Sequence, residues 1–348
     1  MTAYYGGIDL SARDSQVCVI DAEHTRHVEQ KVPNVLDDID RLLAPYKAHL
    51  KIVVESTFNW YWLIDGLQER GYEVCLAHTL GLYMITGAKV KTDRRDAFAL
   101  AKLLSAKMIP EAYIYPKAKR SVRDLVRRRA RVVQMRASEY ASMRRMLYRH
   151  GILEHSRYGM TRMSEEDVER WFDDPRVQLT GKYSIERIHL YTRHIKGIES
   201  EVALALKGAA SYRRLMSLPG VDRILATTIY FETGDIGRFR KAKHYSSFCR
   251  LVPGISQSGR VVRRGRNPNQ GNHYLKWAFN QAASYAVRYY EPIRAYFQHL
   301  LQTHHGRARK LIAYNAVAHK LGVAAYHILR DGEVYCQEKM FGAAIPSA

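Results

Sequence analysis

The chain is poor in cysteine and in carboxylates, and it has no long apolar run. Its 348 residues include four cysteines, which lie far apart and form no CxxC pair. This spacing argues against a disulfide framework and a structural zinc site, and it favours a reducing, cytoplasmic compartment. No apolar run approaches the roughly 20 residues of a membrane-spanning helix, and residues 1–5 lack the features of a signal peptide. We therefore expect no membrane partner.

Acidic residues are scarce, and their scarcity is uneven along the chain. Lys and Arg total 55 against 34 Asp and Glu, a net charge of +21. Residues 236–290 hold 11 Lys and Arg and no carboxylate, and residues 117–149 hold 12 Lys and Arg against two acids. Phosphate repels carboxylates and binds clustered cations with release of counterions. An anionic membrane or plain solubility would also explain the net charge, but this clustering favours nucleic acid.

The first part of the chain, residues 1–116, predicts an α/β domain. Apolar alternation and short apolar runs predict strands at 5–10, 16–21, 28–32, 51–54 and 73–77. Helical spacing predicts helices at 35–48, 60–70 and 93–107. Three strands followed by alternating helices and strands indicate a mixed central sheet.

The middle part, residues 117–210, predicts long helices. Residues 117–149 contain neither Gly nor Pro and read as one long basic helix, and a second helix is expected at 184–206. The two would form a coiled-coil hairpin, or they are solvated helices that bridge domains. Four arginines of the first helix are predicted to bind nucleic acid: Arg127, Arg128, Arg129 and Arg131.

The last part, residues 211–340, predicts a mainly helical domain. Leu218-Pro219-Gly220 resembles the turn of a helix-hairpin-helix element, in which amides at a helix N-terminus meet a phosphate. Residues 251–276 are rich in Gly and basic residues and read as a loop.

Four carboxylates form the most informative pattern. Asp9 is expected on the first strand and Glu55 near the end of a neighbouring one, while Asp93 and Asp96 lie three apart on one helix face. Hard divalent cations need oxygen ligands from several elements. Two such ions stabilise both the attacking and the leaving oxygen of phosphoryl displacement. Each acid alone is more simply a turn or cap residue, so the prediction depends on the joint pattern.

Ser258 is a second candidate for chemistry. It precedes Gly259 in the basic loop, where a hydroxyl and nearby guanidinium groups suit attack on a backbone phosphate. A turn serine is the simpler interpretation of this motif, and Ser256 is the alternative nucleophile. Arginines that would contact the phosphates follow it: Arg260, Arg263, Arg264 and Arg266.

Together these motifs resemble the DEDD transposases of insertion sequence family 110, which include the Piv-type DNA invertases. The N-terminal likeness consists of Gly7-Ile-Asp9, Glu55-Ser-Thr and Lys91-Thr-Asp93-Arg-Arg-Asp96. The C-terminal likeness consists of Leu218-Pro-Gly220, Phe248 to Pro253, Gln257-Ser258-Gly259 and Gly271-Asn272. Many relatives have Ala-Gly-Leu-x-Pro where this chain has Cys249-Arg-Leu-Val-Pro, so Arg250 in place of Gly is expected to alter the backbone before Ser258.

The resemblance implies a fold, a cofactor and partners. It implies a RuvC-like (ribonuclease H) domain, a coiled-coil segment and a C-terminal transposase domain. It implies that Asp9, Glu55, Asp93 and Asp96 bind two Mg²⁺ ions, replaceable by Mn²⁺, and that Ser258 forms a phosphoserine with DNA. It also implies donor and target DNA, a structured guide (bridge) RNA, and homodimers that assemble into a tetramer.

Three functions remain open at the level of the sequence. The preferred one is an RNA-guided, site-specific DNA recombinase. The second is a RuvC-like metal-dependent nuclease of the junction-resolving type, which forms no covalent intermediate. The third is a non-catalytic nucleic-acid-binding protein that retains the fold. Ser258 distinguishes the first two, and the four acids distinguish the third.

Overall fold

The computed structural model describes residues 3–86, 93–152, 157–258, 261–265, 270–303 and 305–341. For residues 83–86, 93, 157–158, 255–258 and 261–265 it describes the backbone alone. The chain divides into two compact units, Met1–Lys117 and Ala118–Ala348.

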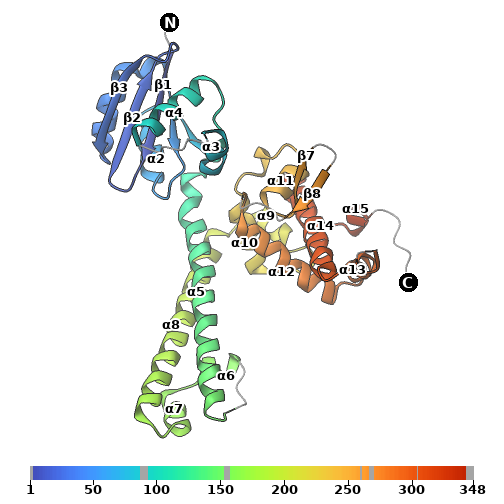
Figure 1. Cartoon of the computed structure of the whole chain (residues 1–348). Helices are drawn as coiled ribbons and strands as arrows, with labels where there is room; N and C mark the ends of the chain where they lie inside the picture. Colours follow the sequence, from blue (N-terminus) through green and yellow to red (C-terminus); the bar gives the residue numbers. More distant parts are fainter. Residues whose placement is uncertain are drawn as a thin grey trace. The chain divides into compact units, whose positions relative to one another are not determined.

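A six-stranded mixed sheet forms the centre of the first unit (Figure 1). The strand order is β3-β2-β1-β4-β5-β6, in which β1 runs parallel to β4 and β4 to β5, while β2, β3 and β6 are antiparallel to their neighbours. This confirms the expected mixed sheet. The strands are β1 (Tyr4–Leu10), β2 (Asp14–Ile20), β3 (Arg26–Pro33), β4 (Leu50–Glu55), β5 (Glu73–Ala77) and β6 (Glu111–Ala112).

Helices cover both faces of this sheet. One face packs on α1 (Leu36–Leu43) and α2 (Tyr61–Glu69), through side chains such as Ile8 and Val54. The other face packs on α4 (Asp93–Ser105), through Val53 and Cys18. Successive residues of a strand point to opposite faces, so β1 and β4 are buried from both sides. The sequence did not reveal β6 or α3 (Thr79–Thr86).

The helix expected at 35–48 is shorter than predicted. It ends at Leu43, and a 3₁₀ helix, η1 (Ala44–His49), continues the chain with Pro45 in its first turn. A proline inside an α-helix removes one hydrogen bond and clashes with the preceding turn. The ring of Pro45 would meet the carbonyl of Arg41, four residues earlier, so α1 ends before Pro45.

Two long helices open the second unit, α5 (Lys117–Arg149) and α8 (Pro175–Ala205). They lie side by side and antiparallel (Figure 1), joined by Arg129 to Glu199 and, further along, by Glu139 to Arg187. The bounds of α5 are those predicted, whereas α8 begins nine residues earlier than the predicted 184 because Asp174 caps it and Pro175 occupies its first turn. Between them lie α6 (Arg157–Arg162) and α7 (Glu165–Trp171).

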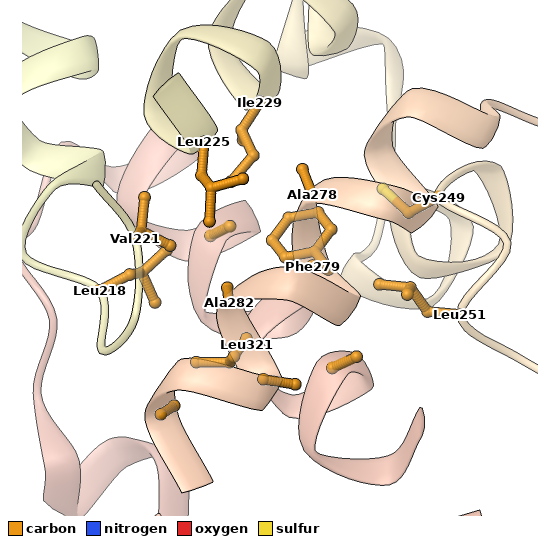
Figure 2. Close-up of a cluster of buried hydrophobic side chains, with 14 of the residues drawn as sticks. Leu218, Val221, Leu225, Ile229, Cys249, Leu251, Ala278, Phe279, Ala282 and Leu321 are labelled. Atoms are coloured by element: carbon orange, nitrogen blue, oxygen red, sulfur yellow. The ribbon is translucent and has the colours of Figure 1, made fainter. Parts of the chain in front are cut away.

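The rest of the second unit is mainly helical, as expected. A continuous core joins α10, α12 and α14, and Figure 2 shows Leu225 and Ile229 directed toward Phe279 and Leu321. The elements are α9 (Ala210–Leu215), α10 (Arg223–Thr233), η2 (Ile236–Arg238), α11 (Ala242–Phe248), β7 (Gly254–Ser258), β8 (Val261–Gly265), α12 (His273–Tyr289), α13 (Glu291–Thr303), α14 (Arg309–Asp331) and α15 (Gln337–Phe341). Among the described residues, no helix is both long and apolar enough to span a membrane.

The turn before α10 packs against the backbone of α12. Gly220 has φ +75°, and a Cβ there would lie 2.2 Å from the carbonyl oxygen of Ala282. Asp222 caps α10, accepting a hydrogen bond from the amide of Leu225 at 2.8 Å. The predicted turn is therefore present, but a carboxylate already occupies the helix N-terminus where a phosphate was expected.

The close contact between α4 and β1 gives a test of the first unit. A Cβ on Gly7 would lie 2.1 Å from the carbonyl oxygen of Ala97, whereas a Cβ on Gly6 would make ordinary contacts of 3.4 Å and longer. We expect Gly7→Ala to lower the free energy of unfolding by about 1–3 kcal/mol through overpacking, measured by urea denaturation. Gly6→Ala is the matched control. Equal stability of the two variants would show that α4 does not rest on Gly7.

Candidate active site

Two of the four predicted acids stand at neighbouring strand ends. Ile8 on β1 is paired with Val54 on β4, so the next residues, Asp9 and Glu55, continue side by side. Neighbouring strands lie about 4.8 Å apart. Because Ile8 and Val54 belong to the core on the α1 and α2 side, alternation directs Asp9 and Glu55 to the opposite face. Both are half-buried.

Helix α4 lies on that same face and carries the other two acids. Ala97 packs on Gly7, two residues before Asp9 on the same face of β1. Asp96 precedes Ala97, is half-buried, and has its Oδ2 oxygen buried. Asp93 is the first residue of α4, and its side chain lies outside the described residues. The fold thus brings Asp9, Glu55 and the N-terminal turn of α4 to one face of the sheet.

Side-chain amides hold the loop that follows Asp9. The carbonyl oxygen of Ser11 accepts hydrogen bonds from Nδ2 of Asn34 at 3.0 Å and from Nδ2 of Asn59 at 2.9 Å. Asn59 lies just after β4, so this bond joins the chain segments beyond the two strand-end acids. The edge of the sheet at Asp9 and Glu55 is therefore held from both sides.

The basic residue beside Asp93 is paired with another part of the sheet. Arg94 forms an ion pair with Glu29 on β3, and this hydrogen bond lowers the pKa of the Glu29 carboxyl below its ordinary value. Arg95 is exposed. The charge of Arg94 is thus directed toward β3, which fixes the N-terminal turn of α4 over the sheet.

The donor set fits a hard divalent cation. Carboxylate oxygens from a strand, a neighbouring strand and a helix are the ligands that Mg²⁺ or Mn²⁺ prefers. Among the residues whose side chains the structure describes, no three His, Cys, Asp or Glu groups gather closely enough to hold a metal. Asp93, the fourth predicted ligand, is not among these residues.

Ser258 lies in a β-hairpin, not in the loop that the sequence predicted. Strands β7 and β8 pair antiparallel, with Ser258 opposite Val261 and Ser256 opposite Arg263. Ser258 is the last residue of β7. The two strands carry three apolar residues, Ile255, Val261 and Val262, in no alternating order, so apolar periodicity gave no signal for them. Gly259, Arg260 and Arg266 lie outside the described residues.

Arg250 adopts the backbone conformation expected of the glycine it replaces. Its φ is +58°. It follows the end of α11, where the amide of Leu251 donates to the carbonyl of Ser246 at 3.0 Å and the amide of Arg250 to that of Ser247 at 2.9 Å. These two bonds form a Schellman motif, whose left-handed position is usually glycine. The motif is thus kept despite Arg250, at a cost in backbone strain of about 1–2 kcal/mol.

A buried carboxylate connects α5, α10 and the start of α12. Glu232 is 3% exposed and accepts from Arg127 through both oxygens, at 2.6 and 2.8 Å. Nδ2 of Asn272 donates to the same carboxylate at 2.6 Å, while Oδ1 of Asn272 caps α12 by accepting from the amides of Tyr274 and Leu275. Asn272 is the N-cap of α12, so this network fixes the start of that helix.

The predicted nucleic-acid-binding arginines of α5 divide into two pairs. Arg127 is bonded to Glu232, and Arg129 is bonded to Glu199 on α8. Arg128 and Arg131 are exposed. The hypothesis of a nucleic-acid surface therefore rests, on this helix, on Arg128 and Arg131. Arg263 and Arg264 lie on β8, where the structure describes the backbone alone.

Comparison with known proteins shows which family combines these features. A model of the DEDD transposases of IS110 type matches residues 6–151, and one described as the transposase IS116/IS110/IS902 family matches residues 212–298. The chain belongs to the IS110 family of DEDD transposases. It is therefore a DNA transposase, and its family implies dependence on divalent metal.

Individual relatives have the same activity in their names. A Sinorhizobium fredii protein named transposase y4qE is 25% identical over 78% of this chain and 68% of its own length. A family 20 transposase of Pseudomonas aeruginosa is 24% identical over 81% of this chain and 83% of its own. The transposase for insertion sequence element IS1111A of Coxiella burnetii is 28% identical over 50% and 52%.

Burial disfavours the thiolate form of three of the four cysteines. Burial raises the pKa of the Cys249 thiol far above its ordinary value, and it raises the pKa of Cys18 and of Cys75 to about 11. Protonated thiols are poor nucleophiles. A hydroxyl nucleophile therefore has no competing thiolate among these three residues.

The network around Glu232 was missed from the sequence and can be tested. Its signal was an acid inside the apolar helix 223–233, just before the carboxylate-free stretch. We expect Glu232→Ala to lower the free energy of unfolding by about 3 kcal/mol, because it leaves Arg127 without its buried partner. Glu199→Ala, which removes the more exposed partner of Arg129, should cost less than about 1 kcal/mol. Urea denaturation measures the free energy of unfolding of both variants. Comparable losses of stability in the two would contradict a special role for Glu232.

Proposed function

We propose that this transposase is an RNA-guided, site-specific DNA recombinase. In it, Asp9, Glu55, Asp93 and Asp96 hold two Mg²⁺ ions and Ser258 is the nucleophile. The observation that carries the proposal is the juxtaposition of Asp9 and Glu55 at adjacent strand ends. They lie on the face against which α4, bearing Asp93 and Asp96, is packed.

The sheet supports a RuvC-like, ribonuclease H fold for the first unit. Three antiparallel strands, β1 to β3, are continued on the other side of β1 by the parallel strands β4 and β5. The carboxyl ends of β1 and β4 then meet at one edge, which is where parallel sheets commonly place ligand-binding residues. The acids of this chain occupy that edge.

The metal ions would be held by the carboxylates of both strand ends and of α4. When bound, divalent ions stabilise charge on the oxygens of a phosphodiester under attack. The protein's own contribution is to fix the donors. Gly7 and Ala97 set the approach of α4, while Arg94 and Glu29 hold its first turn. Asn34 and Asn59 hold the loop beyond Asp9.

The serine would conserve the energy of the cleaved bond. Oγ of Ser258 attacks phosphorus, the phosphorus–oxygen bond to one deoxyribose breaks, and the hydroxyl proton passes to the leaving oxygen. The resulting phosphoserine is a phosphodiester like the one broken, so attack by a new strand hydroxyl rejoins DNA and regenerates the serine. Direct hydrolysis would instead leave free ends.

The acids are tested by changing charge while keeping shape. We expect Asp9→Asn, Asp93→Asn and Asp96→Asn each to abolish DNA cleavage and to leave DNA binding within about twofold, because catalysis needs the metal while binding depends mainly on phosphate contacts. Glu73→Gln is the control, since Glu73 is an exposed acid at the opposite end of β5, paired with Lys51. If Asp96→Asn cleaves DNA as fast as wild type in the presence of Mg²⁺, Asp96 of α4 is not a ligand of the catalytic metal ions.

The nucleophile is tested by trapping its adduct with DNA. We expect wild-type protein to form an adduct that survives denaturation, and Ser258→Ala to bind DNA but to form none. Ser256→Ala should keep the adduct. The reverse result would keep the mechanism and move the nucleophile to Ser256. If wild-type protein cleaves DNA and never forms an adduct, the RuvC-like nuclease that only hydrolyses DNA becomes the better description.

A guide RNA and an assembly of dimers into a tetramer complete the proposal. The resemblance described above implies both, and Arg128 and Arg131, which are exposed on α5, offer positive charge to a polyanion. Guide RNA would supply the sequence specificity through base pairing with donor and target DNA.

The guide is tested by comparing ligands. We expect RNA transcribed from the flanks of the coding gene to bind at least as tightly as random duplex DNA. Both affinities should fall steeply between about 50 and 200 mM salt. Arg128→Gln with Arg131→Gln should lower the salt dependence, whereas Arg129→Gln, whose side chain is paired, should change it less. If protein free of RNA recombines DNA, the proposal of a guide RNA is wrong, whereas the proposed roles of the four acids and of Ser258 are unaffected.

A further inference from the structure

Helix α12 has two unlike faces. Its buried face is built of small residues, Ala278, Ala282 and Ala286, and the turn at Gly220 packs directly on its backbone there. Figure 2 shows Ala278, Phe279 and Ala282 directed into the core. These contacts fix the helix by its backbone, and its other face is turned away from this core.

The outer face carries large aromatic side chains. Trp277 is 41% exposed, Tyr285 56% and Tyr289 62%. The rings of Tyr285 and Tyr289 are stacked, with centroids 6.2 Å apart and planes 23° from parallel. Trp277 and Tyr285 are eight residues apart, which on a helix is about 12 Å. We call Trp277, Tyr285 and Tyr289 the aromatic stripe.

The charge around the stripe is positive. Arg288 lies on the same outer face, and its guanidinium is 5.4 Å from the centroid of the Tyr289 ring. Residues 236–290 contain no carboxylate. The first acid that follows, Glu291, is in an ion pair with Arg294 at 2.8 Å. A polyanion can therefore approach the stripe without meeting an unpaired carboxylate from its own helix.

We infer that the aromatic stripe binds unpaired bases of single-stranded nucleic acid by stacking, with Arg288 on the adjoining phosphate. Every base presents a flat face, and exposed aromatic rings in a positive setting are the usual means of holding a single strand without regard to its sequence. Exposed aromatic rings are costly on a surface that has no partner. In a duplex the faces of the bases are covered by neighbouring bases, so they are not accessible to the stripe.

The inference deepens the proposed function, because guided recombination requires both unpaired RNA and melted DNA. The source of the strand is left to the experiment, since oligouridylate and oligothymidylate present the same kind of base on different sugars. Self-association of the chain through the stripe is the competing explanation of its exposure. The absence of carboxylates argues against it, since two positive faces repel each other.

The test compares matched variants of the full chain. Tyr285→Ala with Tyr289→Ala removes the stacked pair, and Tyr285→Phe with Tyr289→Phe keeps the rings. Tyr148→Ala with Tyr183→Ala is the control, because these tyrosines are 52% and 54% exposed but lie on α5 and α8. Fluorescence anisotropy measures affinity for oligothymidylate, oligouridylate and a mixed-sequence duplex, and light scattering measures the mass of each variant.

We expect the alanine pair to bind single strands about five- to a hundredfold more weakly for each stack lost, with duplex binding and mass unchanged. The phenylalanine pair and the control pair should bind as wild type. The slope of log affinity against log salt should stay the same in the alanine pair and fall by about one in Arg288→Gln.

Three results would overturn the inference. They are an undiminished affinity of the alanine pair for single strands, an equal loss for the duplex, and a fall in mass that accompanies the loss. The proposed function fails separately. If the aromatic stripe binds oligothymidylate but wild-type protein does not bind RNA, the inference about the stripe is kept and the proposal of a guide RNA is rejected.

Discussion

The contact between α4 and β1 is the constraint on which the candidate active site depends. A helix normally rests on a sheet through side chains, at a distance that leaves its own backbone far from the strand. Here Gly7 has no side chain, and the backbone of α4 at Ala97 and Ala101 descends onto it. Asp96 is thereby lowered toward the strand that carries Asp9. Any side chain at position 7 would lift the helix and the acids it bears.

In the second unit, a buried carboxylate, and not a close backbone contact like that of α4 with β1, fixes the start of α12. Glu232 binds Arg127 of α5 and Asn272 at the start of α12. A buried charge is tolerated only where it is paired and hydrogen-bonded, and Glu232 has three donors from these two residues. The helix that leads away from the hairpin is thus fixed at its first turn. The aromatic stripe lies further along that same helix.

Much of the fold could be predicted from the sequence, and the exceptions have physical causes. Five strands of the first sheet and the helix 117–149 follow from apolar periodicity, which records burial directly. The hairpin of β7 and β8 did not, because its two strands are short and lack an alternating hydrophobic pattern. Pro45 and Pro175 set helix ends that periodicity alone misplaces.

The candidate site shows the same division. Strand-end acids such as Asp9 and Glu55 are conspicuous because a buried strand rarely ends in a carboxylate without a reason. Glu232 acts through contacts with Arg127 and Asn272, which are 105 and 40 residues away in the chain, and nothing local in the sequence predicts such a pairing. Arginine content likewise predicted a nucleic-acid surface but not which arginines reach it. Acids from distant segments neutralise Arg127 and Arg129, and so the cations that remain for phosphate are selected by the fold rather than by composition.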